Sequence, residues 1–305
     1  MSLLSAVNSA MRIAIAGASG FIGTALTARF KSQGHEVLKI SRKANKSTDL
    51  VWDIDTGMLD ATALEGLDAV VHLAGENLSR GRWTGRRKRS ILQSRTLSTR
   101  LLSTTLAHLD RPPAVLLVAS AVGYYGSRGS ETVDESSSSG AGFLADVCRA
   151  WEAAADPARA AGIRVVHARQ GMVLGNGGAL RLMALPFKLG LGGRIGTGEQ
   201  YMPWIALADV VAAYEFLIHN EAIEGAVNFV APEQVTNREF TSALGKAVRR
   251  PTILPLPAFM ARIIFGEMAD ELLLASTRVN PKVLVSAGYE FTCPTLIQAL
   301  EAALK

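Results

Sequence analysis

Cysteine, charge and long apolar runs are all scarce in this sequence. Two cysteines among 305 residues are too few for a disulfide scaffold or a cysteine-based structural zinc site, and they suit a reducing compartment. Charged residues make up 19% of the chain, which excludes a disordered chain and a long coiled coil. No uninterrupted apolar run reaches the roughly 18 residues that a membrane span needs. We therefore expect a globular, cytoplasmic protein with no membrane partner.

The charge balance is only mildly basic. Lysine and arginine number 32 and the acids 27, a net charge of +5, which suits an anionic small ligand but is too small for a nucleic-acid-binding protein. An acid-free stretch from Asn77 to Leu109 holds a basic tract with one aromatic, Trp83. We expect a solvated helix face over residues 86–89, and a phosphate contact from Arg95, which lies one helical turn past Ile91. The members of the tract are Arg80, Arg82, Arg86, Arg87, Lys88, Arg89, Arg95 and Arg100.

Short apolar runs alternate with longer helical patterns in the first half of the chain. Helical spacing of apolar residues covers 86–108 and 143–161. This alternation predicts an α/β fold: a doubly wound, parallel, Rossmann-type sheet with helices on both faces. The β-rich runs are residues 12–16, 36–41, 68–73, 114–119 and 163–168.

The character of the chain changes at Gly171, after which glycines cluster and helical patterns dominate. We expect residues 11–170 to form the dinucleotide-binding core. Residues 171–305 would form a smaller, mostly helical substrate region whose chain crosses back to the core. Prolines at 251, 255 and 257 mark a joint, so 251–305 is a predicted small C-terminal module. Residues 1–10 precede a second methionine and are predicted to be a dispensable leader.

A glycine-rich segment, residues 17–23, follows the first predicted strand and opens the first predicted helix. Backbone without a Cβ lets a pyrophosphate approach closely, and free N–H groups at a helix start bind its charge. An ordinary strand-to-helix turn is the alternative, but the position between strand and helix favours a dinucleotide. The expected contacts are Gly17, Ser19, Gly20, Phe21 and Ile22.

The end of the second strand favours NADP(H) over NAD. An NAD-binding protein places Asp or Glu about 20 residues past the glycines, to bind the ribose 2′-hydroxyl. This chain has Ser41, Arg42 and Lys43 there, and no acid between Glu36 and Asp49. A guanidinium can hold the 2′-phosphate that a carboxylate would repel. A solvated loop pair is the alternative reading of Arg42 and Lys43, but the glycines upstream favour phosphate binding by Ser41 and Arg42.

The three-residue spacing of the glycines resembles that of the short-chain dehydrogenase/reductase superfamily. Residues 118–126 are similar to the strand that supplies the active-site serine of its extended members, such as sugar-nucleotide epimerases. Residues 169–175 resemble their nicotinamide-side loop. This resemblance implies further cofactor contacts. They are Asp53 at the adenine, Leu73, Ala74 and Gly75 beside the pyrophosphate and ribose, and Val173 on the nicotinamide side.

Narrower motifs resemble one branch of that superfamily. They include HLAGEN at residues 72–77, LGLGGRIGTG at 189–198, and Cys148 followed by Trp151 and Glu152. The branch is described as NAD(P)-dependent epimerase-like, or as similar to the cell-division inhibitor SulA, and carries a small C-terminal domain of unknown function. The resemblance covers residues 11–304.

The chain departs from the superfamily at the Tyr-x-x-x-Lys pair that normally transfers the proton. The corresponding helix carries Phe143 and Val147, so carbonyl–alcohol interconversion through that pair is excluded. The hydroxyls that remain near the expected cleft are those of Ser120, Tyr124 and Tyr125. We predict catalysis led by Ser120, which orients substrate in relatives, with Tyr125 as a second candidate proton donor.

Two classes of function stay open at this point. One is an NADP(H)-dependent oxidoreductase or epimerase-like enzyme, acting on a small-molecule substrate of which nucleotide-linked compounds are one class. The other is a non-catalytic, NADPH-responsive binding protein, with the link to cell division that the branch name implies. The five histidines lack metal-ligand spacing, so we expect no metal site. The sequence identifies neither the substrate nor a protein partner.

Overall fold

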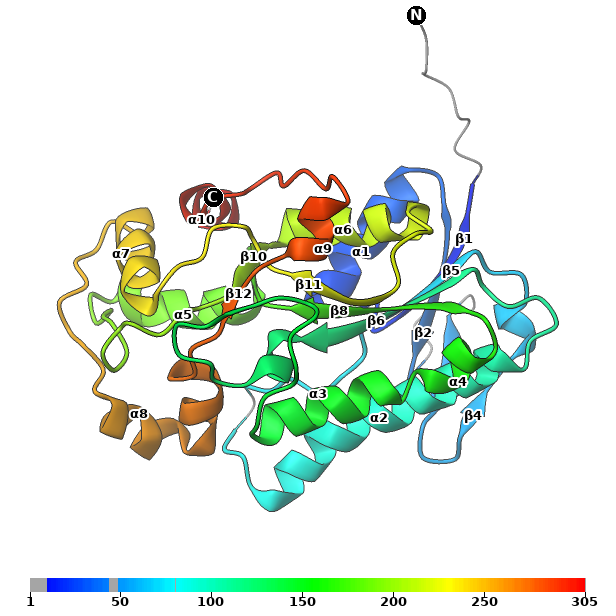
Figure 1. The fold of residues 1–305 in the computed structure, drawn as a ribbon, viewed down its shortest axis with the longest axis horizontal. Helices are drawn as coiled ribbons and strands as arrows, with labels where there is room; N and C mark the ends of the chain where they lie inside the picture. The colour runs from blue at the N-terminus through cyan, green and yellow to red at the C-terminus, as the bar shows by residue number, and fades with distance from the viewer. Residues whose placement is uncertain (1–9, 44–48, 80, 305) are drawn as a thin grey trace, which may run out of the picture.

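An eight-stranded sheet forms the centre of the molecule (Figure 1). The computed structural model describes residues 10–43, 49–79 and 81–304. Neighbouring strands are parallel except for the antiparallel pair β3–β4. In spatial order the strands are β11 (Gly225–Phe229), β8 (Arg164–Gln170), β6 (Val115–Ala121), β5 (Ala69–His72), β1 (Arg12–Ala16), β2 (Glu36–Ser41), β3 (Leu50–Asp53) and β4 (Met58–Leu59).

The strand order confirms the predicted doubly wound topology. Strand β1 is central: Ile13 pairs with Val37 of β2 on one side and with Ala69 of β5 on the other. Ile13 and Ile15 are fully buried, as expected for a strand covered on both faces. The chain order therefore reverses between β1 and β5, and in such sheets ligands bind beside the carboxyl ends of the strands at that point.

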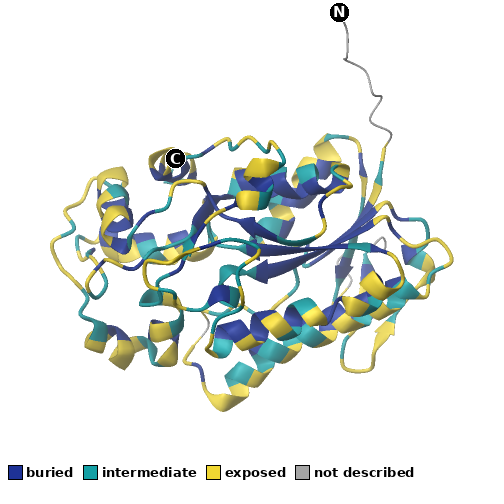
Figure 2. Ribbon diagram, in the orientation of Figure 1, coloured by how far each residue is buried: buried dark blue, intermediate teal, exposed yellow. Residues whose placement is uncertain are grey.

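Helices cover both faces of the sheet (Figure 1). Helices α1 and α6 lie on one face and α2, α3 and α4 on the other, and the strands between them are buried (Figure 2). The helix predicted over 143–161 is wrong in one respect, because it divides where Pro157, which has no N–H, opens a new helix. The bounds are α1 (Phe21–Ser32), α2 (Gly85–Ala107), α3 (Phe143–Ala153), α4 (Asp156–Ala160) and α6 (Leu207–His219).

The smaller region lies at the carboxyl ends of the strands, where β9 (Met172–Leu174) continues from β8, and is mostly helical (Figure 1). Trp204 and Phe240 are buried at its centre. None of the helices in the described part of the chain combines the length and the apolar composition that a membrane span requires. The other elements of this region are β10 (Trp204–Ala206), α5 (Gly178–Lys188), α7 (Asn237–Ala247) and α10 (Leu296–Leu304).

The described residues that follow position 250 are divided among four cores, one of which holds Val279 beside Tyr125. Met268 packs beside Trp83 against α2 and α3, Leu284 belongs to the main core next to the sheet, and Leu296 packs with α5 and α7. The chain also returns to the main sheet through β11. The residues after position 250 therefore pack against both the sheet core and the smaller region and connect them. Their elements are α8 (Ala258–Phe265), the π-helix η3 (Ala269–Leu273), α9 (Lys282–Ser286), and β12 (Arg278–Val279), which pairs with β7 (Thr132–Val133).

We predict that Asp209 anchors the C-terminal segment. Its carboxylate is fully buried and accepts the N–H groups of Thr292 (2.6 Å) and Cys293 (3.0 Å). Asp209→Ala would leave both N–H groups without an acceptor, so we expect the free energy of unfolding in urea to fall by about 2–4 kcal/mol. Asp156→Ala, which removes an exposed first-turn carboxylate paired with Arg159, should change it by less than about 1 kcal/mol. Equal losses would contradict the anchoring role.

Candidate functional site

The glycine turn forms as predicted between β1 and α1. Gly17 has a φ of +82°, and a Cβ there would lie 2.8 Å from the backbone nitrogen of Ala74. A Cβ on Gly23 would lie 2.3 Å from the carbonyl oxygen of Gly17. Only glycine fits either position. The start of α1 is thereby held against the end of β5.

No acidic side chain of the helix itself lies in the first turn of α1. Gly20 is the N-cap of α1 and supplies no side chain. Ser19 and Gly20 are exposed. The N–H groups of a helix start need acceptors from outside the helix, and within the described chain no side chain caps them. This arrangement fits a pyrophosphate.

The end of β2 lies directly beside this turn, since the Gly17 N–H points at the carbonyl of Ile40 (3.4 Å). Arg42 is exposed there, and Ser41 donates its hydroxyl to the carbonyl of Lys43 (2.5 Å). The Arg42 side chain thus carries a positive charge next to an anion-free helix start. This fits a nucleotide with an additional phosphate on its ribose.

Side chains of α2 form hydrogen bonds to the segment after β5 and fix its position. The Glu76 N–H donates to the Ser94 hydroxyl (3.2 Å), and the Ser90 hydroxyl donates to the Glu76 carboxylate (2.7 Å). The Ser90 hydrogen bond, helped by Arg87 and Arg42, lowers the pKa of Glu76. The segment also carries Leu73, Ala74 and Gly75, the predicted pyrophosphate and ribose contacts, and the Leu73 N–H is held by the Ala16 carbonyl (2.8 Å).

Arg95 of α2 also holds the segment after β5 by hydrogen bonding. Its guanidinium donates to the carbonyls of Ile91 and Glu76 (both 3.0 Å) and stacks on Trp151. The residue is buried. This differs from the phosphate contact that we expected, because two of its donor groups are already committed to the protein backbone.

The basic tract is also less solvated than expected. Arg87 forms an ion pair with Glu76, and Lys88 pairs with Glu267 (2.7 Å). The prediction of a solvated face over 86–89 is therefore wrong for these two residues, which fasten α2 to neighbouring segments. Arg80 lies outside the described residues.

The remaining predicted cofactor residues lie on different elements. Asp53 ends β3, and its carboxylate accepts the N–H groups of Asp55 (3.0 Å) and Thr56 (3.3 Å), which fixes a turn. Hydrogen bonds from Thr56 lower the pKa of Asp53. Val173 lies in β9 opposite Ile205. The adenine contact of Asp53 and the nicotinamide contact of Val173 stay predictions.

Phe21 connects the glycine turn to the nicotinamide-side loop. Its ring lies so close to Gly175, Gly177 and Gly178 that a Cβ on any of them would come within 2.8–3.0 Å of it. The backbone of Phe21 belongs to the turn, while its side chain packs on the loop after β9. The two halves of the predicted cofactor site are therefore in direct contact.

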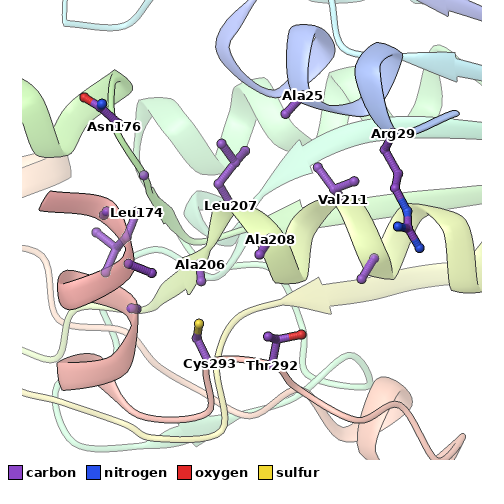
Figure 3. A pocket seen from close by; sticks show the side chains of 15 residues that line it. Ala25, Arg29, Leu174, Asn176, Ala206, Leu207, Ala208, Val211, Thr292 and Cys293 are labelled. Atoms are coloured by element: carbon purple, nitrogen blue, oxygen red, sulfur yellow. The ribbon is translucent and has the colours of Figure 1, made fainter. Parts of the chain in front are cut away.

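A separate hollow of about 540 Å³ lies between α1, α6 and α10 (Figure 3). Small apolar side chains such as Ala25, Ala206 and Ala208 dominate its wall. Arg29 at its margin is already paired with Glu215 (2.9 Å). None of the predicted cofactor residues lines it, and it lacks a free charged group, so we assign it no part in nucleotide binding.

Ser120 lies at the end of β6 and Tyr125 in the 3-10 turn that follows it (Val122–Tyr125), but both hydroxyl protons are used inside the protein. Ser120 donates to Glu152 (2.7 Å) and Tyr125 donates to Asn228 (2.7 Å). Both residues are buried, with 3% and 0% of their surface exposed. Burial raises the pKa of Tyr125 to about 12. This geometry opposes the predicted role of Tyr125 as a proton donor.

A buried ion pair organises this end of the sheet. Arg169 at the end of β8 donates from two nitrogens to the two carboxylate oxygens of Glu152 on α3 (both 2.9 Å), and a third nitrogen donates to the Tyr125 hydroxyl (3.0 Å). The guanidinium carbon also lies 3.4 Å from the centre of the Tyr124 ring. Of the three candidate hydroxyl residues, Tyr124 alone is not buried. We did not predict the Arg169–Glu152 pair, although both residues fall in segments that carry the family resemblance.

The start of α3, where the superfamily places its tyrosine and lysine, is apolar and covered. Val147 packs with Trp83 and Met268, and the Phe143 ring meets Trp83 edge-to-face at 5.3 Å. Glu271 of η3 accepts the N–H groups of Phe143 and the next residue (both 3.1 Å). The C-terminal part of the chain thus fills the position of the missing proton relay with apolar side chains and caps the helix with its own carboxylate.

His72, His167 and Cys148 are buried, packed residues. Burial lowers the pKa of His72 to about 3 and that of His167 to about 4. Burial raises the pKa of Cys148 to about 12, so its thiol is a poor nucleophile at neutral pH. Among the described residues no group of His, Cys, Asp or Glu could hold a metal ion.

The order of these parts matches a known family. A family model described as the NAD dependent epimerase/dehydratase family matches residues 13–229. The chain belongs to this family. A second model, a domain of unknown function (DUF1731), matches residues 256–303, the part that covers the start of α3.

Two relatives support the assignment over nearly the whole chain. An epimerase family protein of Mycobacterium bovis is 48% identical over 290 residues, which cover 94% of this chain and 96% of that protein. The human epimerase family protein SDR39U1 is 37% identical over 297 residues, covering 95% and 99%. A crystal structure of human SDR39U1 (isoform 2) with NADPH has a TM-score of 0.87 at 35% identity, covering 96% of this chain and 99% of that one. The Rossmann-like fold and the NAD(P)-dependent family are thereby confirmed.

We predict that the Arg169–Glu152 pair stabilises the fold at neutral pH. Glu152→Gln leaves a buried guanidinium without its counter-charge, so the free energy of unfolding should fall by about 3–5 kcal/mol at pH 7. Glu131→Gln, which breaks an exposed pair with Arg128, should cost less than about 1 kcal/mol.

The pH dependence gives a second readout of the same pair. Burial opposes ionisation of Glu152, but the Arg169 hydrogen bonds and charge outweigh it, so the pKa of Glu152 is lowered. The contribution of the ionised Glu152 carboxylate to the free energy of unfolding is complete above the unfolded pKa of about 4.3. It is lost as the pH falls through the lower pKa of the folded state. The difference between wild type and Glu152→Gln should shrink over that acidic range. A difference that stays constant down to the lowest accessible pH would contradict this assignment.

Proposed function

We propose that this protein binds NADP(H). One observation carries the proposal: the exposed Arg42 at the end of β2, with no acid between Glu36 and Asp49, beside the anion-free first turn of α1. The relative SDR39U1 was crystallised with NADPH, which supports the same choice of nucleotide.

The proposed contacts follow from the placement of each residue. Gly17, Ser19, Gly20, Phe21 and Ile22 surround the start of α1 and would hold the pyrophosphate through backbone N–H groups. Ser41 and Arg42 would hold the 2′-phosphate, and Asp53 would border the adenine. The residues on the ribose and nicotinamide side would be Leu73, Ala74, Gly75 and Val173.

Removing the Arg42 guanidinium should abolish the preference for NADPH over NADH. Loss of a charge-assisted pair to phosphate costs about 1.5–3 kcal/mol, so Arg42→Ala should weaken NADPH binding about 10- to 150-fold while leaving NADH binding unchanged. Arg100→Ala, which removes an exposed arginine of α2, should leave both affinities unchanged. Calorimetric titration of both nucleotides tests this, and a wild type that binds NADH as tightly as NADPH would refute the proposal.

We further propose that the protein is an NADP(H)-dependent oxidoreductase for a small-molecule substrate. The bound nucleotide would supply hydride, and a carbonyl acceptor needs a hydrogen-bond donor as well. Ser120 stays the first candidate, provided that its hydroxyl turns from Glu152 to the substrate. We assign Tyr125 no role as a proton donor, because its hydroxyl is buried and donates to Asn228. Epimerisation through a tyrosine and lysine pair is excluded, because Phe143 and Val147 stand there.

The covered start of α3 favours a second candidate function, a protein that binds NADPH without turning over a substrate. Phe143 and Val147 offer no proton, and Glu271 uses its carboxylate to cap the helix. Such a protein would report the NADPH level through its bound and free states.

A turnover assay separates the two candidates. We expect NADPH oxidation with at least one member of a panel of aldehydes, ketones, quinones and nucleotide sugars. Ser120→Ala should reduce kcat by about 10²-fold or more if its hydroxyl polarises the acceptor. Tyr125→Phe should leave kcat within a few-fold once stability is matched. Turnover unaffected by Ser120→Ala would refute its role, and no turnover on any substrate would favour the binding protein.

A further inference from the structure

Large apolar side chains are unusually exposed on one part of the molecule. Sixteen large apolar residues of the described chain are exposed, and ten of them lie in residues 178–194 and 253–264. Scattered exposed apolar residues are normal, whereas a contiguous group marks an interaction surface. The ten are Leu182, Leu185, Leu189, Leu191, Ile253, Leu254, Phe259, Met260, Ile263 and Ile264.

Helix α8 shows the pattern most clearly. It has eight residues, of which Ala261 alone is buried. Phe259 is 61% exposed and Ile263, one turn later, is 67% exposed. A surface helix normally turns its apolar side chains to the core, but α8 turns them to solvent. The helix lies at the periphery of the molecule, and much of its surface is exposed (Figures 1 and 2).

Backbone pairing joins the two segments into one surface. The Leu256 N–H donates to the carbonyl of Arg194 (2.8 Å), and the Gly196 N–H donates to the carbonyl of Leu256 (2.8 Å). The Arg250 guanidinium donates to the carbonyl of Lys188 at the end of α5 (3.2 Å). We call residues 178–194 and 246–265 the apolar–basic surface.

This surface carries positive charge and no negative charge. Residues 175–198 and 240–266 contain no Asp or Glu. Its cations are all exposed, and within the described chain only Arg262 has an ion-pair partner, Asp270 (2.9 Å). The cations are Arg181, Lys188, Arg194, Lys246, Arg249, Arg250 and Arg262.

The charge pattern selects the occupant. A second copy of this chain would bring cations against cations, of which only Arg262 has an acidic partner among the described residues, so the surface does not suit self-association. A protruding apolar helix with cations around it matches an element that lies in the interface of an anionic bilayer, with apolar side chains among the acyl chains and cations at the headgroups. We propose that the apolar–basic surface binds reversibly to anionic lipid membranes.

Such binding is distinct from membrane insertion. A helix that spans a bilayer needs about 20 apolar residues, whereas α8 and its neighbours need only lie on the surface. The expectation of no membrane partner came from the absence of a long apolar run, which does not bear on surface binding. The proposal does not depend on the oxidoreductase reaction or on the identity of the bound nucleotide.

Vesicle co-sedimentation tests the proposal on the full-length protein. At low salt we expect binding to equimolar phosphatidylcholine–phosphatidylglycerol vesicles, little binding to pure phosphatidylcholine, and release at high salt. Each cation near an anionic surface contributes about fivefold, so Lys188→Gln with Arg249→Gln should lower the partition coefficient about 25-fold. Phe259→Ser with Ile263→Ser should lower it more than about tenfold, since both insertions are lost.

Matched variants elsewhere control for charge and exposure. Lys31→Gln with Arg100→Gln removes two exposed cations of α1 and α2, and Ile297→Ser removes a 61% exposed side chain of α10. Both should bind vesicles like wild type. All variants should keep the wild-type thermal midpoint and nucleotide affinity, which separates failure of this proposal from failure of the nucleotide proposal.

Three results would overturn the proposal. The first is a wild-type protein that does not bind anionic vesicles at low salt. The second is equal loss of binding in the surface and control variants. The third is a concentration-dependent dimer, or a complex with a soluble acidic amphipathic peptide, that Phe259→Ser with Ile263→Ser abolishes while vesicle binding is absent.

Discussion

The close approach of two backbones, that of Gly17 and that of Ala74, is the constraint on which the site depends. It brings the start of α1 to the end of β5 at the point where the strand order reverses. Any side chain at Gly17 would separate them, since its Cβ would already overlap the Ala74 backbone. The uncapped N–H groups of α1, the loop that follows β5 and the cation at the end of β2 thereby face a common space. The nucleotide with a 2′-phosphate that we propose would satisfy each of them.

The C-terminal part of the chain determines which side chains lie at the start of α3. Met268 and Glu271 reach the start of α3 from more than a hundred residues away and leave no proton donor there. On the other side of α3, the Arg169–Glu152 pair takes up the hydroxyl of Ser120. The family assignment therefore establishes ancestry and fold, and the tyrosine and lysine pair that usually transfers the proton is absent at Phe143 and Val147.

Local patterns predicted much of the fold and the outline of the cofactor site. The runs 12–16 and 36–41 match β1 and β2 residue for residue, because alternating apolar residues between glycines and polar turns fix a strand locally. The glycine turn was predictable for the same reason. The break before α4 was missed, although Pro157 was the signal for it.

Long-range pairing accounts for what the sequence did not reveal. Arg95 is buried, and its partners are backbone carbonyls, one of which only the folded loop after β5 presents. Tyr125 follows a strand end, but its burial depends on Asn228, which lies 103 positions away in β11. The capping of α3 by Glu271 bridges 128 positions. No short-range pattern encodes such contacts.

A crystal structure of the protein with NADP⁺ tests the central claim most directly. The account predicts density for the 2′-phosphate beside Ser41 and Arg42, with Phe143, Val147 and Met268 still in contact at the start of α3. A 2′-phosphate that avoids Arg42, or a C-terminal part that moves away and exposes a proton-donating side chain at the nicotinamide, would contradict it.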